Sequence, residues 1–95
     1  MNIFYFTSMY YVVYILEDQI DKTWYIGFTK NLKQRLKDHK SGHSPYTSKK
    51  RNWKHIYAEM YLNKADALGR EKFLKSGAGH RFIKKQLAGY FNGEK

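Results

Sequence analysis

The feature that most constrains the fold of this chain is a nearly unbroken run of apolar residues, many of them β-branched or aromatic, from Tyr10 to Leu16. A strand with apolar residues at successive positions is typical of burial on both faces of a sheet. The chain has 95 residues, which gives room for one domain with one modest core. An aromatic content of 18% helps so small a core to hold.

Two further strands are predicted. Residues from Thr23 to Phe28 are again aromatic and β-branched, and the polar segment 17–22 before them predicts a short hairpin connection. Strands joined in this way should pair antiparallel. From Lys54 to Leu62 the residues alternate, with His55, Tyr57, Glu59 and Tyr61 expected on one side of the strand.

Capping residues and apolar spacing predict three helices. Between the first helix and the third strand, residues 42–52 hold Gly, the single Pro and three consecutive basic residues, which predicts a mobile basic loop. The resulting order is ββαβαα, in an α+β fold. The predicted helices begin at Thr29 or Asn31 and end near Lys40, begin at Asn63 and close at 75–77, and run from about Gly79 to Gly89.

The ends of the chain are expected to lie outside this domain. We expect residues 1–8 to form an N-terminal extension, residues 9–90 the domain and residues 91–95 a tail. The opening segment is apolar but short and lacks a basic region, so it is a poor signal peptide. Met9 could be the natural start. No run approaches the length of a membrane span.

The charge balance favours a polyanionic partner. Eighteen Lys and Arg residues face eight Asp and Glu residues, which gives a formal net charge of +10. Inside a cell the usual polyanion is nucleic acid. An anionic membrane surface is the competing interpretation, but the basic residues are spread along the chain and not set on one amphipathic helix. The absence of cysteine excludes disulfides and thiolate zinc sites, and it fits a cytoplasmic location.

Two helices carry ionisable groups on stripes that should face the core. In the first, Arg35 and His39 share a stripe with Leu32 and Leu36. A charged residue at such a position needs a partner or a ligand. The alternatives are that Arg35 extends along apolar surface to water and that His39 is a satisfied or surface histidine.

On the second helix, Glu71 interrupts a stripe formed with Ala67, Leu68 and Leu74. One interpretation is a structural ion pair, with Arg35 as a possible partner. The other is a single carboxylate ligand for Mg²⁺, which keeps several waters and takes one or two carboxylates plus phosphate oxygens. Two helices with this anomaly are better evidence than one, because their groups could converge.

Tyr14 and Tyr25 lie on the first two predicted strands, so antiparallel pairing could bring the two phenols near each other. The alternative is packing, since the chain holds nine tyrosines. Gly27, after Tyr25, suits a place where another part of the chain approaches the backbone closely.

Taken in order, these residues resemble the GIY-YIG endonuclease superfamily, and the nearest similarity is to its small single-domain branch, which is related to the N-terminal domain of the excision-repair nuclease (excinuclease ABC). The similarity covers roughly Met9 to Leu87. The residues that carry it are Val12-Val13-Tyr14-Ile15, Tyr25-Ile26-Gly27-Phe28-Thr29, Arg35, His39 and Arg70-Glu71-Lys72-Phe73-Leu74-Lys75-Ser76-Gly77.

The resemblance implies a small three-stranded antiparallel sheet flanked by helices and a metal-dependent endonuclease that hydrolyses DNA phosphodiester bonds, in DNA repair or processing. It implies Tyr14 and Tyr25 as the two motif tyrosines, Arg35 and His39 as the helix residues, and Glu71 as the ligand of one Mg²⁺ or Mn²⁺ ion. We expect Tyr14 to act as general base, as phenolate or through hydrogen bonding. Its phenol, with an ordinary pKa near ~10, would need the metal, Arg35 or a basic neighbour to lower that pKa.

DNA is the expected partner, with no membrane and no small-molecule cofactor. Lys33, Lys49, Lys50 and Arg51 are expected to contact the phosphate backbone without reading sequence. Val12 stands where the family has glycine, which a strand interior does not need. No separate DNA-recognition domain fits in the chain, which argues against tight sequence recognition. The alternatives are a non-catalytic nucleic-acid-binding module with the same fold and, from a third class, an adaptor for membrane surfaces or acidic proteins.

Overall fold

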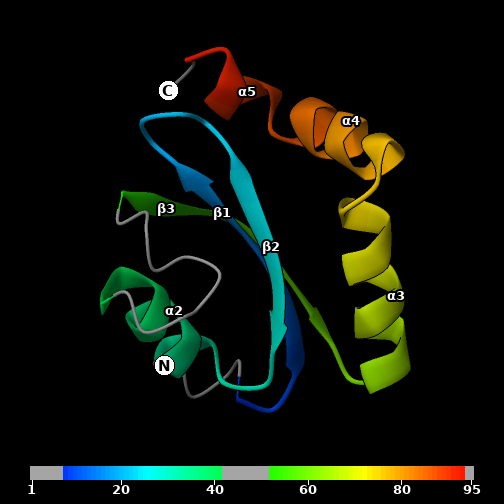
Figure 1. Cartoon of the computed structure of the whole chain (residues 1–95). Coiled ribbons are helices and arrows are strands. Elements are labelled where there is room, and N and C mark those ends of the chain that lie inside the picture. The colour runs from blue at the N-terminus through cyan, green and yellow to red at the C-terminus, as the bar shows by residue number, and fades with distance from the viewer. Residues whose placement is uncertain (1–7, 42–51, 94–95) are drawn as a thin grey trace.

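The computed structural model describes residues 8–41 and 52–93, and its centre is a three-stranded antiparallel sheet in the order β2-β1-β3 (Figure 1). β1 (Tyr11–Asp18) lies in the middle, between β2 (Trp24–Thr29) and β3 (Trp53–Tyr61). The predicted α+β fold is confirmed. The expected strand boundaries are correct to within two residues.

Helices cover both faces of β1, as its apolar run predicts. One face of the sheet packs Val13 and Ile15 against α3 (Lys64–Leu74) and α4 (Gly77–Gln86). The other face packs Val12, Tyr14 and Leu16 against α2 (Leu32–Ser41). Figure 1 shows α2 and α3 on opposite sides of the sheet. The alternation of side chains along a strand therefore divides β1 between two separate cores.

Local hydrogen bonds set where the helices begin. The Asn31 side chain accepts from the Gln34 N–H at 3.1 Å and so caps α2. The Asn63 side chain accepts from the Ala65 N–H at 2.8 Å and caps α3. These caps satisfy N–H groups that have no partner within the helix. Of the two starts predicted for the first helix, Thr29 and Asn31, the structure has Asn31, and the predicted start at Asn63 is confirmed.

The third predicted helix is two helices. α4 begins at Gly77, two residues earlier than expected, because the Ser76 side chain caps it by accepting from the Gly79 N–H at 3.1 Å. The helix then breaks at Leu87, whose φ and ψ of −107° and 34° are not helical, and the short α5 (Ala88–Phe91) follows. Phe91, which the sequence assigns to a tail, packs against the core.

α5 is tied to the β1–β2 hairpin through a buried carboxylate. Glu17 is 3% exposed and accepts hydrogen bonds from the Tyr90 hydroxyl at 2.6 Å and the Trp24 indole N–H at 3.1 Å. These bonds offset the cost of burying its charge. Within the described ranges, no helix has the length and apolarity that crossing a membrane requires.

An irregular register between β1 and β3 changes which residues share a face. Ile15 pairs with Tyr57, but the next residue, Leu16, pairs with His55, so β3 carries a bulge at this point. A bulge inserts one extra residue and reverses the alternation beyond it. His55 therefore lies on the α2 side, whereas Tyr57 lies on the α3 side. The expectation that both occupy one side is wrong for this reason.

The close approach of α3 and α4 predicts unequal effects of two glycine substitutions. A Cβ at Gly79 would lie 2.5 Å from the Leu74 Cα and closer still to the Phe73 carbonyl oxygen, whereas a Cβ at Gly69 meets nothing within 4 Å. We expect Gly79→Ala to lower the free energy of unfolding by about 1–3 kcal/mol or more. Gly69→Ala, the matched control on α3, should raise it by about 0.4–1 kcal/mol. Urea unfolding measures both, and equal effects would contradict this packing.

Candidate active site

Tyr14 lies at the centre of the candidate site. It occupies the middle of β1, is 1% exposed, and points into the core on the α2 side of the sheet. Its hydroxyl lies 2.8 Å from Nε2 of His39, which is also 1% exposed, in a buried hydrogen bond. The Tyr25 ring lies beside both, with centroid distances of 6.1 Å to Tyr14 and 4.7 Å to His39. Three of the five residues chosen from the sequence are thus in contact.

Gly27 makes the position of the Tyr14 ring possible. The two residues are cross-strand partners in the β1–β2 ladder. A Cβ at Gly27 would lie 2.5 Å from the Tyr14 hydroxyl oxygen and closer still to Cζ of the same ring. Any side chain at this position would therefore displace the phenol. The close approach expected at Gly27 is that of the Tyr14 ring.

Burial keeps Tyr14 protonated. Its pKa is raised, chiefly by burial and next by the neighbouring Tyr25, and the charge of Arg35 opposes this without reversing it. A hydrogen bond with Tyr25 and the charge of Glu71 raise the pKa further. To act as a phenolate without a metal ion, Tyr14 would need Arg35 to bring its pKa below the ordinary value. Arg35 does not do so.

Burial also keeps His39 neutral. Burial, followed by the positive charge of Arg35, lowers the pKa of His39 below its ordinary value of 6.5, and Asp38 opposes the shift. A neutral imidazole has one nitrogen that donates and one that accepts. With the proton on Nδ1, Nε2 accepts from the Tyr14 hydroxyl. In that tautomer the phenol donates and the imidazole accepts.

Arg35 lies at the edge of this cluster and not inside it. Leu32 and His39 are buried and Leu36 is half-buried, but Arg35 is exposed. The expectation that all four face the core is wrong for Arg35, whose guanidinium stays in water. Its charge nevertheless acts on both Tyr14 and His39.

Glu71 lies on α3, on the other side of the sheet from α2 (Figure 1). Its side chain is 20% exposed, and Oε2 lies 3.6 Å from Nζ of Lys75 in an i,i+4 ion pair. The sequence suggested Arg35 as a possible ion-pair partner of Glu71, but in the structure Glu71 pairs with Lys75. The charge of Glu71 acts on Tyr14. Leu68, expected on the same inner stripe, is 42% exposed, because the helix turns its Ala67–Leu74 line toward the sheet.

The donors at this site suit a hard divalent cation. A carboxylate and phenol oxygens are the ligand type that Mg²⁺ and Mn²⁺ prefer. Glu71 is accessible and its only ion pair among the described residues is the long contact with Lys75. Over residues 8–41 and 52–93, no three His, Asp or Glu side chains gather into a metal-binding group. That Glu71 holds such an ion stays a prediction.

Two residues beside the site were not foreseen as part of it. The edge of the His55 ring faces the Tyr14 ring at a centroid distance of 6.4 Å. Trp53 and His55, with Leu36, His39 and Lys40, line a hollow of about 300 Å³ next to α2. Only the β3 bulge brings His55 to this side, and a bulge leaves no clear mark in an alternating sequence.

The basic residues chosen for DNA contact divide into two groups. Lys33 is exposed on α2, as are Lys37 and Lys40 on the same helix. Lys49, Lys50 and Arg51 lie outside the described residues, so their role stays a prediction.

A known family model matches the stretch of sequence that forms β1, β2, α2 and α3. The family model described as "GIY-YIG catalytic domain" matches residues 10–84. The chain therefore belongs to the GIY-YIG superfamily of nucleases, as the ordered motif predicted.

Similar proteins from several bacteria carry the name "UPF0213 protein". One from Syntrophus aciditrophicus is 42% identical over 65 residues, which is 66% of this chain and 74% of the relative. One from Clostridium perfringens is 39% identical, covering 66% of this chain and 68% of the relative. YazA of Bacillus subtilis is 36% identical, covering 58% of this chain and 57% of the relative. No solved structure gives a significant match.

The lowered pKa of His39 predicts a stability that depends on pH. Below the ordinary value of 6.5, the unfolded chain binds a proton that buried His39 does not, so the free energy of unfolding should fall as the pH falls from about 7 toward about 5. Arg35→Gln removes one cause of the lowered pKa and should flatten this slope. Urea unfolding across that range, with NMR titration of the His39 ring, measures both. A His39 midpoint at or above 6.5 would contradict the buried neutral imidazole.

Proposed function

We propose that this protein is a divalent-metal-dependent endonuclease that hydrolyses DNA phosphodiester bonds in the repair or processing of DNA. The observation that carries the proposal is the buried 2.8 Å hydrogen bond between Tyr14 and His39, inside the region that matches the GIY-YIG catalytic domain. Membership of a nuclease superfamily supports the reaction class, and the geometry supports a way to move a proton.

The phenol and imidazole suit a proton relay. Because burial disfavours the phenolate, Tyr14 is better suited to pass a proton on than to hold a negative charge. Its hydroxyl oxygen would accept a proton from the attacking water as its own proton moves to Nε2 of His39. His39 is neutral at pH 7 and so has a lone pair to receive it. Tyr25, which touches both rings, would orient them.

Two charged side chains complete the site. Arg35 would stabilise the negative charge that grows on the phosphoryl oxygens. Glu71 would hold one Mg²⁺ or Mn²⁺ ion. When bound, such an ion polarises the phosphate and stabilises the leaving oxygen. The charges of both residues already act on Tyr14, which supports placing them at one site.

DNA is the substrate that the surface charge suits. The formal net charge is +10, and α2, which carries Arg35 and His39, also exposes Lys33, Lys37 and Lys40. Lysines on this helix would hold phosphates that flank the scissile bond, with no base readout.

Tyr14→Phe tests the relay, because it removes one hydroxyl and hardly changes packing volume. In a plasmid-nicking assay with Mg²⁺ or Mn²⁺, we expect the cleavage rate to fall by about 10²–10⁴-fold, with DNA affinity unchanged. Tyr11→Phe is the matched control, since Tyr11 is on the same strand and stacks on Phe28. If Tyr14→Phe and Tyr11→Phe cleave equally well, Tyr14 is not in the proton path.

Glu71→Gln tests the metal ligand by removing a charge at constant shape. We expect it to abolish metal-dependent cleavage of plasmid and of branched or flapped DNA while binding to DNA is kept or strengthened. Asp66→Asn, the same change at an exposed position of α3, should cleave like the parent. A parent protein that binds DNA but never cleaves it with either metal would be a binding module and not a nuclease.

A further inference from the structure

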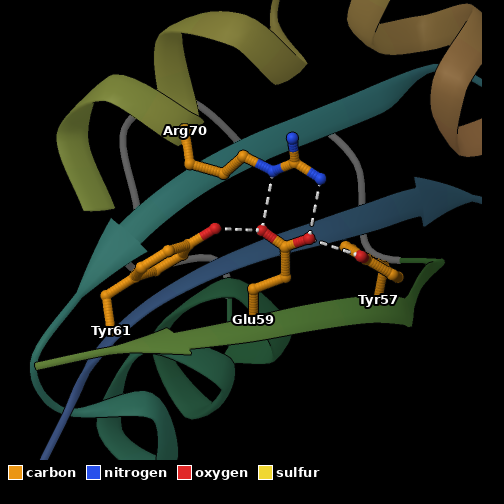
Figure 2. A network of polar contacts seen from close by, with 4 residues as sticks. All are labelled: Tyr57, Glu59, Tyr61 and Arg70. Carbon is orange, nitrogen blue, oxygen red and sulfur yellow. Dashed lines mark hydrogen bonds and ion pairs between the residues drawn. The ribbon is translucent and has the colours of Figure 1, made fainter. Parts of the chain in front are cut away.

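A second polar cluster lies on the other side of the sheet, between β3 and α3 (Figure 2). We call the residues Tyr57, Glu59, Tyr61 and Arg70 the Glu59 cluster. Arg70 donates from Nε to Oε1 of Glu59 at 2.8 Å and from Nη2 to Oε2 at 3.0 Å. The Tyr57 and Tyr61 hydroxyls donate to the same carboxylate at 2.5 and 2.7 Å. One carboxylate therefore receives four hydrogen bonds in a fixed arrangement.

The guanidinium of Arg70 is held on its apolar sides as well. It lies over the rings of Phe73 and Phe82, at 5.0 and 4.6 Å from their centroids. The hydrogen bonds from Arg70 and the two tyrosines keep the pKa of Glu59 below its ordinary value, although burial acts to raise it. Burial and the bond to Glu59 raise the pKa of Tyr61 to about 12. The cluster thus keeps one charge state across neutral pH.

Arg70 and Glu71 flank the line along which α3 packs on the sheet. Ala67 and Leu74, on that line, are fully buried. Successive residues are about 100° apart around an α-helix. Arg70 points to β3, where it meets Glu59, and Glu71 lies on the other flank of the line. The roll of α3 about its own axis therefore sets the position of both side chains together.

We propose that the Glu59–Arg70 pair positions Glu71 by fixing the roll of α3 on the sheet. Ala67 and Leu74 pack by apolar contact, which is non-directional and by itself defines the roll of the helix less sharply than directional bonds do. A bidentate Arg–carboxylate pair defines the roll, because it has two parallel bonds in one plane. Glu59 and Arg70 are positioning residues, and the proposal rests on the role proposed for Glu71.

A small roll is enough to matter. Side chains extend to about 5–6 Å from the helix axis, so a roll of about 20° moves the Glu71 carboxylate by about 2 Å. Misplacement by about 1 Å can lower a reaction rate by about 10²-fold. Loss of a group that orients a metal ligand typically lowers metal affinity or activity by about 10–100-fold.

The test separates positioning from stability with two variants. Glu59→Leu combined with Arg70→Met replaces the ion pair with apolar side chains, a change that often keeps or raises stability. Tyr57 and Tyr61 are half-buried, so their hydroxyls can turn to water. Arg70→Lys keeps the charge but loses the two-bond geometry. Arg81→Lys, on an exposed part of α4, is the matched control.

Four quantities are measured on each full-length variant: the thermal unfolding midpoint, DNA affinity, Mn²⁺ affinity by calorimetry without DNA, and the cleavage rate. We expect the double variant to unfold at or above the parent temperature and to bind DNA within about twofold of the parent. Its Mn²⁺ affinity and cleavage rate should each fall by about 10–100-fold. Arg70→Lys should show the same losses of Mn²⁺ affinity and cleavage rate, and Arg81→Lys should match the parent.

The opposite result is equally clear. If Glu71→Gln loses Mn²⁺ binding and cleavage while the folded double variant and Arg70→Lys retain both, the pair serves stability alone and the positioning proposal is wrong. If the parent binds no Mn²⁺, or Glu71→Gln binds it as well as the parent, the role of Glu71 fails first and the positioning proposal fails with it. If the double variant does not fold, the Mn²⁺ affinity and cleavage rate of Arg70→Lys decide between positioning and stability.

Discussion

Burial of β1 on both faces is the constraint on which the rest of the structure depends. Every residue from Val12 to Asp18 is buried, so in a chain of 95 residues both faces of one small sheet must be covered. α2 supplies one cover, and α3 with α4 supplies the other. Each cover is thin, which brings polar groups on the helices within reach of the central strand. A small protein obtains a buried cluster of polar groups in this way without a large core.

Placing a tyrosine on this strand has direct chemical consequences. Tyr14 takes its phenol into the core, where burial raises its pKa, and the same core lowers the pKa of His39. Burial disfavours charge on either group, so their 2.8 Å hydrogen bond joins two neutral groups. The geometry depends on Gly27, because no larger residue leaves room for the ring.

The two faces of the sheet carry different polar clusters. The α2 face holds the tyrosines and His39, with Arg35 at its solvent edge. The α3 face holds the Glu59 cluster, and α3 also carries Glu71, which pairs with Lys75. The polar groups of the Glu59 cluster have their hydrogen-bonding partners within it, which is why a charged pair can lie under a helix of so small a protein.

The sequence by itself determined the doubly buried strand, the order of elements, the helix starts at Asn31 and Asn63, and the family, because these follow from local composition, capping chemistry and an ordered motif. It also singled out Tyr14, Tyr25 and His39, which the fold brings into contact. Only the tertiary structure decided that Arg35 stays in water, that Leu68 faces outward and that Arg70 faces the sheet, because the roll of a helix depends on what it packs against. The same holds for His55, since a bulge in β3 arises from pairing with β1. Long-range contacts fixed these features, and no local pattern encodes them.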